Sequence, residues 1–108
     1  MIQLDKSQIQ DRFDFARAVD AIRAAYIAVA EGRVQTPPVT YLGFPETAGD
    51  CHVKSGHIEG DDIFVVKIAT GFYDNPSKGL PSSNGMNLVF SAKTGTPVAF
   101  LQDEGWLT

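Results

Sequence analysis

Apolar residues near the start of the chain follow the spacing of a helix. From Asp14 onward they recur at alternating steps of four and three positions, which places them in one stripe along a helical surface. The stripe consists of Phe15, Val19, Ile22, Tyr26 and Val29. Asp14 can cap the first turn, and Gly32 can adopt the left-handed conformation that ends a helix. The pattern therefore predicts one long helix between these two residues.

The rest of the chain has the pattern of strands. β-branched and aromatic residues dominate after Pro37 and Pro38, and Gly or Pro interrupts them every several residues. We expect strands over residues 39–44, 51–55, 62–70, 86–92 and 97–103, with a hairpin connection at 93–96 in which Gly95 adopts positive φ. A short strand over residues 1–4 and a helical turn to about residue 12, capped by Asp5 or Ser7, precede the long helix.

This order of elements predicts an α+β fold, in which the N-terminal helix packs on a mostly antiparallel sheet of about five to six strands. Segments 63–68 and 88–90 are apolar on both alternation phases, which indicates a sheet that is covered on both sides. One helix covers only one side, and Trp106 and Leu107 have no later residues to bury them. We therefore expect an edge or a face of the sheet to form a homodimer, or a further segment to cover it.

Composition narrows the classes of partner. The 108 residues fit one domain, and 44% hydrophobic with 20% charged residues is ordinary for a globular protein. A net charge of -4 without a basic cluster argues against nucleic acid as a partner. No apolar run is long enough to cross a membrane, and no secretory signal is visible. Cys51 is the single cysteine, so no intrachain disulfide can form, and a cytoplasmic location is expected.

Lys67 is the residue whose position most needs a chemical explanation. It shares a strand face with Ile63, Val65 and Ala69, where an unpaired ammonium group is costly if it is buried. Either an anion such as a substrate carboxylate pairs with it, or its long side chain reaches water at the margin of the sheet. Lys54, on an earlier strand, is open to the same two interpretations.

The segment over residues 71–85 is rich in glycine, proline and small polar residues. It is either a ligand-binding loop or a surface excursion shaped by turn residues. No metal site is expected, because the spacing of the nearby candidates matches no pattern that positions ligands; these are Cys51, His52, His57, Asp61 and Asp62. The chain also has no Gly-x-Gly-x-x-Gly and no phosphate-binding loop. Lys67, Lys54 and the segment remain as the candidate binding elements.

Three blocks of sequence resemble the ornithine cyclodeaminase/mu-crystallin family. They are DIFVVKIA at 62–69, FYDNP with GLPSS at 72–76 and 79–83, and the hairpin LVFSAKTGTPVA at 88–99. In that family an N-terminal part, completed by a helix from the far end of the chain, binds the substrate and forms the dimer through its sheets. A Rossmann domain for NAD(H) or NADP(H) follows it. The resemblance implies that residues 1–108 are the N-terminal substrate-binding and dimerisation part only, without the Rossmann domain.

The resemblance also assigns roles to residues. Lys67 corresponds to the family lysine that contacts the substrate carboxylate, and Lys54 to a lysine near the pocket in some relatives. The remaining expected site residues are Ser82 and Ser83 beside the substrate, and Asn75, Pro76 and Asn84 in the loop near the nicotinamide. Many relatives have an arginine where this chain has Pro38 or Val39, which argues against ornithine itself as the substrate.

The expected function is therefore the N-terminal half of an NAD(P)-dependent amino-acid or imino-acid oxidoreductase or cyclodeaminase. The expected partners are a small amino or imino acid and a second copy of the chain. NAD or NADP would bind the full-length protein, and the 108-residue chain alone is expected neither to hold it tightly nor to turn over substrate. The alternative is a non-catalytic module that binds a small carboxylate or forms a dimer.

Overall fold

Seven strands form one sheet in the computed structural model, which describes residues 1–108. The chain begins with β1 (Ile2–Asp5), α1 (Lys6–Arg12) and α2 (Phe15–Ala30). The strands that follow are β2 (Val34–Gln35), β3 (Thr40–Phe44), β4 (Gly49–Ile58), β5 (Ile63–Phe72), β6 (Ser83–Ser91) and β7 (Pro97–Gln102). Two short 3-10 helices, Pro45–Thr47 and Asn75–Lys78, lie in the connections.

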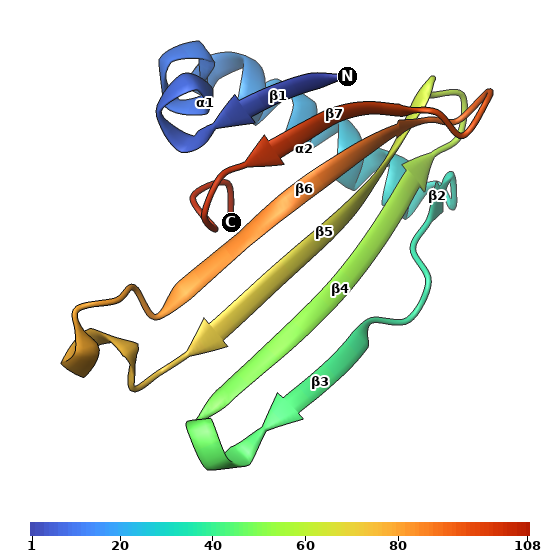
Figure 1. Cartoon of the computed structure of the whole chain (residues 1–108). Helices are drawn as coiled ribbons and strands as arrows, with labels where there is room; N and C mark the ends of the chain where they lie inside the picture. The colour runs from blue at the N-terminus through green and yellow to red at the C-terminus, as the bar shows by residue number, and fades with distance from the viewer.

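The sheet has the order β1-β7-β6-β5-β4-β2, and β3 pairs with another part of β4 (Figure 1). Only the pairing of β1 with β7 is parallel. The expected α+β fold with a mostly antiparallel sheet is therefore confirmed. The connection between β6 and β7 is the expected hairpin, and Gly95 has φ 73°.

Local capping explains where the helices begin and end. Asp5 and Gln8 form a reciprocal capping box at the start of α1. Asp14 accepts a hydrogen bond from the backbone N–H of Arg17 at the start of α2, and Gly32 has φ 72° just after its end. The predicted helix between Asp14 and Gly32 is confirmed. None of the helices is long and apolar enough to cross a membrane.

The strands differ from the sequence expectation at their ends. β4 and β5 each have ten residues, and β6 begins at Ser83, so the connection between β5 and β6 is shorter than the predicted 71–85. The short strand β2 was not expected at all. These additions depend on pairing between distant segments, such as Val34 with Ile58, which local propensity does not report.

The sheet has two unlike faces. Residues directly opposite one another on antiparallel strands point to the same side, and neighbours along a strand point to opposite sides. We call the side on which α2 lies the helix face; it carries the row Lys54, Lys67, Asn87 and Leu101. We call the other side the open face. Its apolar residues include Val53, Phe64, Val66, Ile68, Phe72, Met86, Leu88, Phe90 and Phe100.

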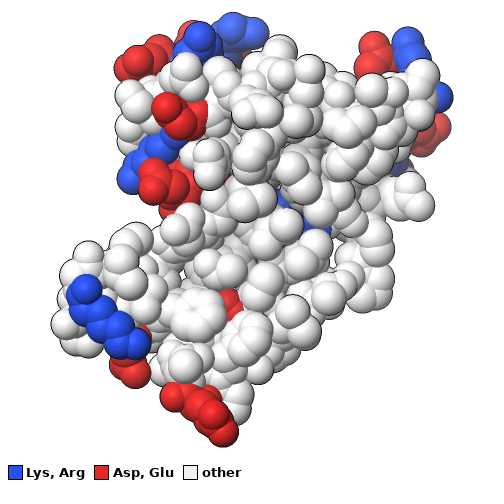
Figure 2. Space-filling view, viewed as in Figure 1, with Lys and Arg blue, Asp and Glu red and all other residues white.

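No element covers the open face. Figure 1 views the sheet from this side, with α2 behind the strands, and Figure 2 shows that the middle of the same side is almost free of charged residues. Aromatic pairs stack across it, Phe64 with Phe90 and Phe44 with Phe72. The open face is therefore an apolar surface that the chain presents without a partner.

The orientation of α2 differs from what its apolar stripe suggests. Ala28 is buried and Ala18 and Ala25 are half-buried, so the small residues form the packed side. Phe15 and Tyr26, from the predicted stripe, are 75% and 73% exposed. The stripe correctly predicts the helix, but it lies away from the side that the chain itself buries.

The accessible area quantifies this exposure. The chain exposes 7617 Å², whereas a compact monomer of 11.7 kDa exposes roughly 5,900 Å². The excess is larger than the ~800 Å² that each partner contributes to a standard protein interface. Only four residues are buried, and the fold therefore lacks the two-sided core that its strands are suited to form.

Candidate functional site

Two lysines face one another at the centre of the helix face. Lys54 on β4 is the direct register partner of Lys67 on β5. Lys67 is half-buried and Lys54 is exposed. Like charges directly opposite on neighbouring strands repel one another, and an anion bound between them would remove this repulsion.

No acidic side chain of the chain does so. The three ion pairs within 4.0 Å join Arg33 to Glu31, His52 to Asp50 and Lys93 to Asp62. Lys54 and Lys67 belong to none of them. Neither lysine therefore has an acidic partner within the chain at this distance.

Polar side chains continue along the helix face toward the ends of β3 and β5. Asp50 lies at the centre of this group, with a side chain that is 20% exposed. The Tyr73 hydroxyl donates a hydrogen bond to Asp50 Oδ2 at 3.0 Å, and His52 Nδ1 lies 3.8 Å from Asp50 Oδ1. The ring of Tyr41 packs edge-on against His52.

Glycine makes room for this group. A Cβ at Gly71 would lie 2.7 Å from the Tyr73 hydroxyl and 3.2 Å from Asp50 Oδ1. The hydrogen bond to Asp50 and the negative charge of that carboxylate, in this order, raise the pKa of Tyr73 above its ordinary value of 10.0; desolvation and Tyr41 raise it further. Tyr73 therefore stays a hydrogen-bond donor at neutral pH.

The connection from β5 to β6 is held by its own hydrogen bonds. Asn75 Nδ2 donates to the carbonyl oxygen of Pro81 at 3.0 Å, and the Phe72 N–H donates to the carbonyl oxygen of Ser82 at 2.7 Å. Pro76 lies in the 3-10 helix between them. The segment is therefore a folded loop at the end of the sheet, next to the Tyr73 hydroxyl.

The expected site residues divide between the two faces. Lys54, Lys67 and Ser83 lie on the helix face, and Ser83 pairs with Gly71 at the end of the sheet. Asn84 is the next residue and points to the open face, where its Oδ1 accepts a hydrogen bond from the Gly85 N–H at 2.8 Å. The structure thus places Ser83 on the face of the lysines, four positions along the sheet from them, and Asn84 on the opposite face.

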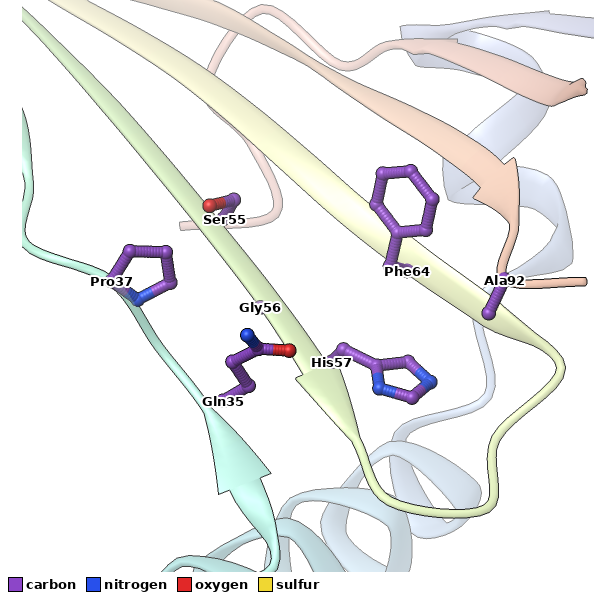
Figure 3. A pocket seen from close by; sticks show the side chains of 7 residues that line it. All are labelled: Gln35, Pro37, Ser55, Gly56, His57, Phe64 and Ala92. Atoms are coloured by element: carbon purple, nitrogen blue, oxygen red, sulfur yellow. The ribbon is translucent and has the colours of Figure 1, made fainter. Parts of the chain in front are cut away.

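The hollows of the surface lie elsewhere. The one in Figure 3 has a volume of about 350 Å³ and lies on the open face at the junction of β2, β4 and β5. Its lining includes Ser55, His57 and Phe64, and His57 Nε2 already lies 3.1 Å from the carbonyl oxygen of Asp61. None of four described hollows is lined by Lys54 or Lys67. The lysine pair therefore lies on a solvent-accessible part of the helix face, not in an enclosed pocket.

The chain contains no group of three or more His, Cys, Asp or Glu side chains that could hold a metal ion.

The sequence analysis did not identify two polar residues of the helix face, Asn87 and Asp103. A signal for Asn87 exists, since it is a polar residue inside the apolar run of β6, as Lys67 is inside β5. Its relation to Lys67 appears only once the register of the two strands is known.

Comparison with known proteins gives one family and several relatives. The model of the ornithine cyclodeaminase/mu-crystallin family matches residues 1–108. A protein of Rhizobium meliloti (strain 1021), whose name describes a dehydrogenase only provisionally, is 45% identical over 91 residues, 84% of this chain and 28% of that protein. An uncharacterized cyclodeaminase of Sinorhizobium fredii (strain NBRC 101917 / NGR234) is 44% identical over 82% of this chain and 26% of its own length.

Solved structures have the same fold. The Δ(1)-pyrroline-2-carboxylate reductase of Thermococcus litoralis, solved with NADH and L-proline, superposes with a TM-score of 0.89 at 22% identity, over 94% of this chain and 32% of that one. An archaeal alanine dehydrogenase dimer with bound NAD gives 0.88 at 26% identity, over 96% and 31%. The chain spans less than a third of the length of each protein compared here.

Proposed function

Because the chain belongs to the ornithine cyclodeaminase/mu-crystallin family, we propose that it is the substrate-binding and dimerising part of an NAD(P)-dependent oxidoreductase or cyclodeaminase. The substrate is a small amino or imino acid whose carboxylate binds Lys67, with Lys54 as a second positive charge. Ser83 lies on the same face four positions along β6 from Asn87, and we propose that Ser83 and its neighbour Ser82 border the site from the end of the sheet.

The lysine pair is the observation that carries the proposal. Lys54 and Lys67 are directly opposed, and neither has an acidic partner within 4.0 Å. A carboxylate between them would remove their repulsion and form charge-assisted hydrogen bonds with one or both ammonium groups. The open surface around them also fits a site that a further domain completes, since catalytic positioning needs a closed geometry.

The chain does not itself contain a cradle for the dinucleotide. It has no Gly-x-Gly-x-x-Gly, and its sheet has no parallel strands joined by a crossover helix of the βαβ type. NAD or NADP would supply the hydride chemistry from a separate domain, with Asn75 and Pro76 at the end of the sheet near it; Asn84 points to the open face and is not part of this proposal. The role of the chain's own residues is to bind and orient the acid.

The partner proposed for the open face is a second copy of the chain. A two-fold sheet-on-sheet contact would cover both apolar open faces at once. The archaeal alanine dehydrogenase, which shares the fold, is described as a dimer. Assembly on the open face would leave the lysines on the helix face accessible.

A non-catalytic carboxylate-binding or dimerisation module is the second candidate, and it would use the same lysine pair and the same open face. Turnover separates the two. We expect the purified 108-residue chain to bind acid without NAD(P)-linked oxidation, and the product of the complete reading frame to oxidise it. A complete protein that binds acid but never reduces NAD or NADP would favour the module. Steady turnover by the 108-residue chain would contradict its assignment as a half enzyme.

The binding experiment compares two lysine variants. L-Proline and L-alanine are titrated into the purified chain by calorimetry. Lys67→Met should weaken binding by about tenfold or more, because a charge-assisted bond is lost. The matched control is Lys93→Met, which removes an exposed lysine whose ion pair with Asp62 contributes little. Equal affinities of the Lys67 and Lys93 variants would overturn the proposed carboxylate site.

A further inference from the structure

Asn87 is the polar neighbour of Lys67 on the other side from Lys54. The register pairs Lys67 on β5 directly with Asn87 on β6, so both side chains lie on the helix face. Both are half-buried. An amide in the middle of an apolar strand needs hydrogen-bond partners for its N–H and carbonyl groups.

Asp103 determines which way the Asn87 amide is turned. Its side chain is 1% exposed, and its Oδ2 accepts a hydrogen bond from the Leu107 N–H at 2.9 Å. Its Oδ1 lies 3.5 Å from Asn87 Nδ2. A carboxylate accepts and does not donate, so only the NH₂ end of the amide can face it favourably. Asp103 lies beyond β7, on one side of β6, whereas Lys67 lies on β5, on the other side.

The carbonyl end of Asn87 is therefore turned toward the strand that carries Lys67. The side chain of Asn87 makes no other hydrogen bond within the chain. Its Oδ1 atom therefore remains available as an acceptor. Directly opposed residues on antiparallel strands have Cα atoms about 5 Å apart. The two groups thus offer a positive charge and a hydrogen-bond acceptor side by side, which matches the carboxylate and the α-nitrogen of one amino or imino acid.

We propose that Asn87 Oδ1 accepts a hydrogen bond from the α-nitrogen of the acid whose carboxylate Lys67 binds. The inference rests on the proposed function and adds a specificity-determining residue to it. Asn87 selects acids with an N–H next to the carboxylate over acids without one. Asp103 is a positioning residue, because it keeps the NH₂ end of the amide away from the ligand.

The test uses two ligands that share a five-membered ring and a carboxylate but differ at the position next to it, where L-proline carries a protonated nitrogen at neutral pH. The result that counts is therefore the change in preference between variants. L-Proline has an N–H beside its carboxylate, and cyclopentanecarboxylate has a CH₂ there. We expect the purified chain to bind L-proline about tenfold more tightly. Asn87→Leu should remove most of this preference by weakening L-proline alone. Gln102→Leu, which removes an amide from the other face of the sheet, is the control and should retain the preference.

The possible results separate this inference from the proposed function. If the parent chain binds neither acid, both are overturned. If it binds both acids through Lys67 but Asn87→Leu keeps the preference, or weakens both acids equally, only the role of Asn87 is overturned.

Asp103→Asn tests the positioning role with the fold kept. An amide at residue 103 can face either end of Asn87, so the preference for L-proline should fall while the affinity for cyclopentanecarboxylate stays unchanged. A parallel fall for the two acids would show a merely structural role for Asp103. Far-UV circular dichroism of each variant establishes that the fold is retained.

Discussion

The two faces of one sheet carry different chemistry on the same strands. The helix face has the opposed lysines, Asn87 and the carboxylate of Asp50. On the open face, strands β3 to β7 place no Lys, Arg, Asp or Glu, and stacked phenylalanines cross it. Lys67 lies between Val66 and Ile68 in the chain, yet it points away from both.

This difference shows how alternation lets one strand serve two purposes. Successive side chains of a strand point to opposite faces, so a ligand-binding row and an assembly surface can be one residue apart in sequence. A slip of one residue in the register would move the lysine into the apolar face. The separation therefore depends on the long, in-register pairing of β4, β5 and β6.

The largest expected effect comes from putting a charge on the open face. Leu88→Arg introduces a guanidinium at the centre of the proposed dimer contact, where it would be buried without an anion. We expect the dissociation constant of the dimer to rise by about a hundredfold or more, measured by sedimentation equilibrium. Ile22→Arg, on the exposed stripe of α2, is the matched control. If the unsubstituted chain stays monomeric at micromolar concentration, the proposed dimer contact on the open face is contradicted.

Sequence patterns predicted the parts of this comparison that depend on local spacing. The helical period gave the helix after Asp14, and alternation with Gly and Pro gave the main strands. The apolar residues on both phases of β5 indicated that both faces would be covered, and the structure shows that no element of the chain covers the open face.

The parts that depend on contacts between distant residues could not be predicted. The pairing of Lys67 with Asn87, and the approach of Asp103 to that row, depend on the register of three strands. The packed side of α2 is another example. The periodicity of large apolar residues identified the stripe that includes Phe15. The side that the chain buries is instead formed by alanines such as Ala28, which the spacing of large residues does not reveal.

The second effect tests the buried carboxylate of the helix face. Asp103→Ala leaves the Leu107 N–H and the Asn87 NH₂ without their acceptors. We expect the free energy of unfolding to fall by about 2 to 3 kcal/mol, measured with urea at fixed protein concentration. Asp20→Ala, at an exposed position of α2, should change it by less than about 0.5 kcal/mol. Similar values for the two variants would show that Asp103 contributes no more than a surface residue.

The third effect tests which side of α2 packs on the helix face. Ala28 is 1% exposed, so Ala28→Leu inserts three carbon atoms into a filled space. We expect a loss of about 1 to 3 kcal/mol in the free energy of unfolding of the chain. Ile22→Ala, at a side chain that is 57% exposed, should lose far less. The opposite ranking in the same urea experiment would mean that the bulky stripe is the packed side.

The smallest effect is a local one at the end of the helix face. The Asp50 carboxylate raises the pKa of Tyr73 by accepting its hydroxyl proton in a hydrogen bond and by opposing the phenolate charge. Because the folded pKa is raised, the contact stabilises the fold at pH values below the ordinary 10.0 and is lost as the pH rises through the raised pKa. Asp50→Asn should therefore shift the Tyr73 titration to lower pH.

Tyrosinate absorbance measures the shift, with Tyr73→Phe to assign the signal and Glu46→Gln as the carboxylate control. An unchanged titration in Asp50→Asn would show that the contacts of Asp50 with its polar neighbours are not formed in solution. The charged part of the helix face would then extend no further than Lys54 and Lys67.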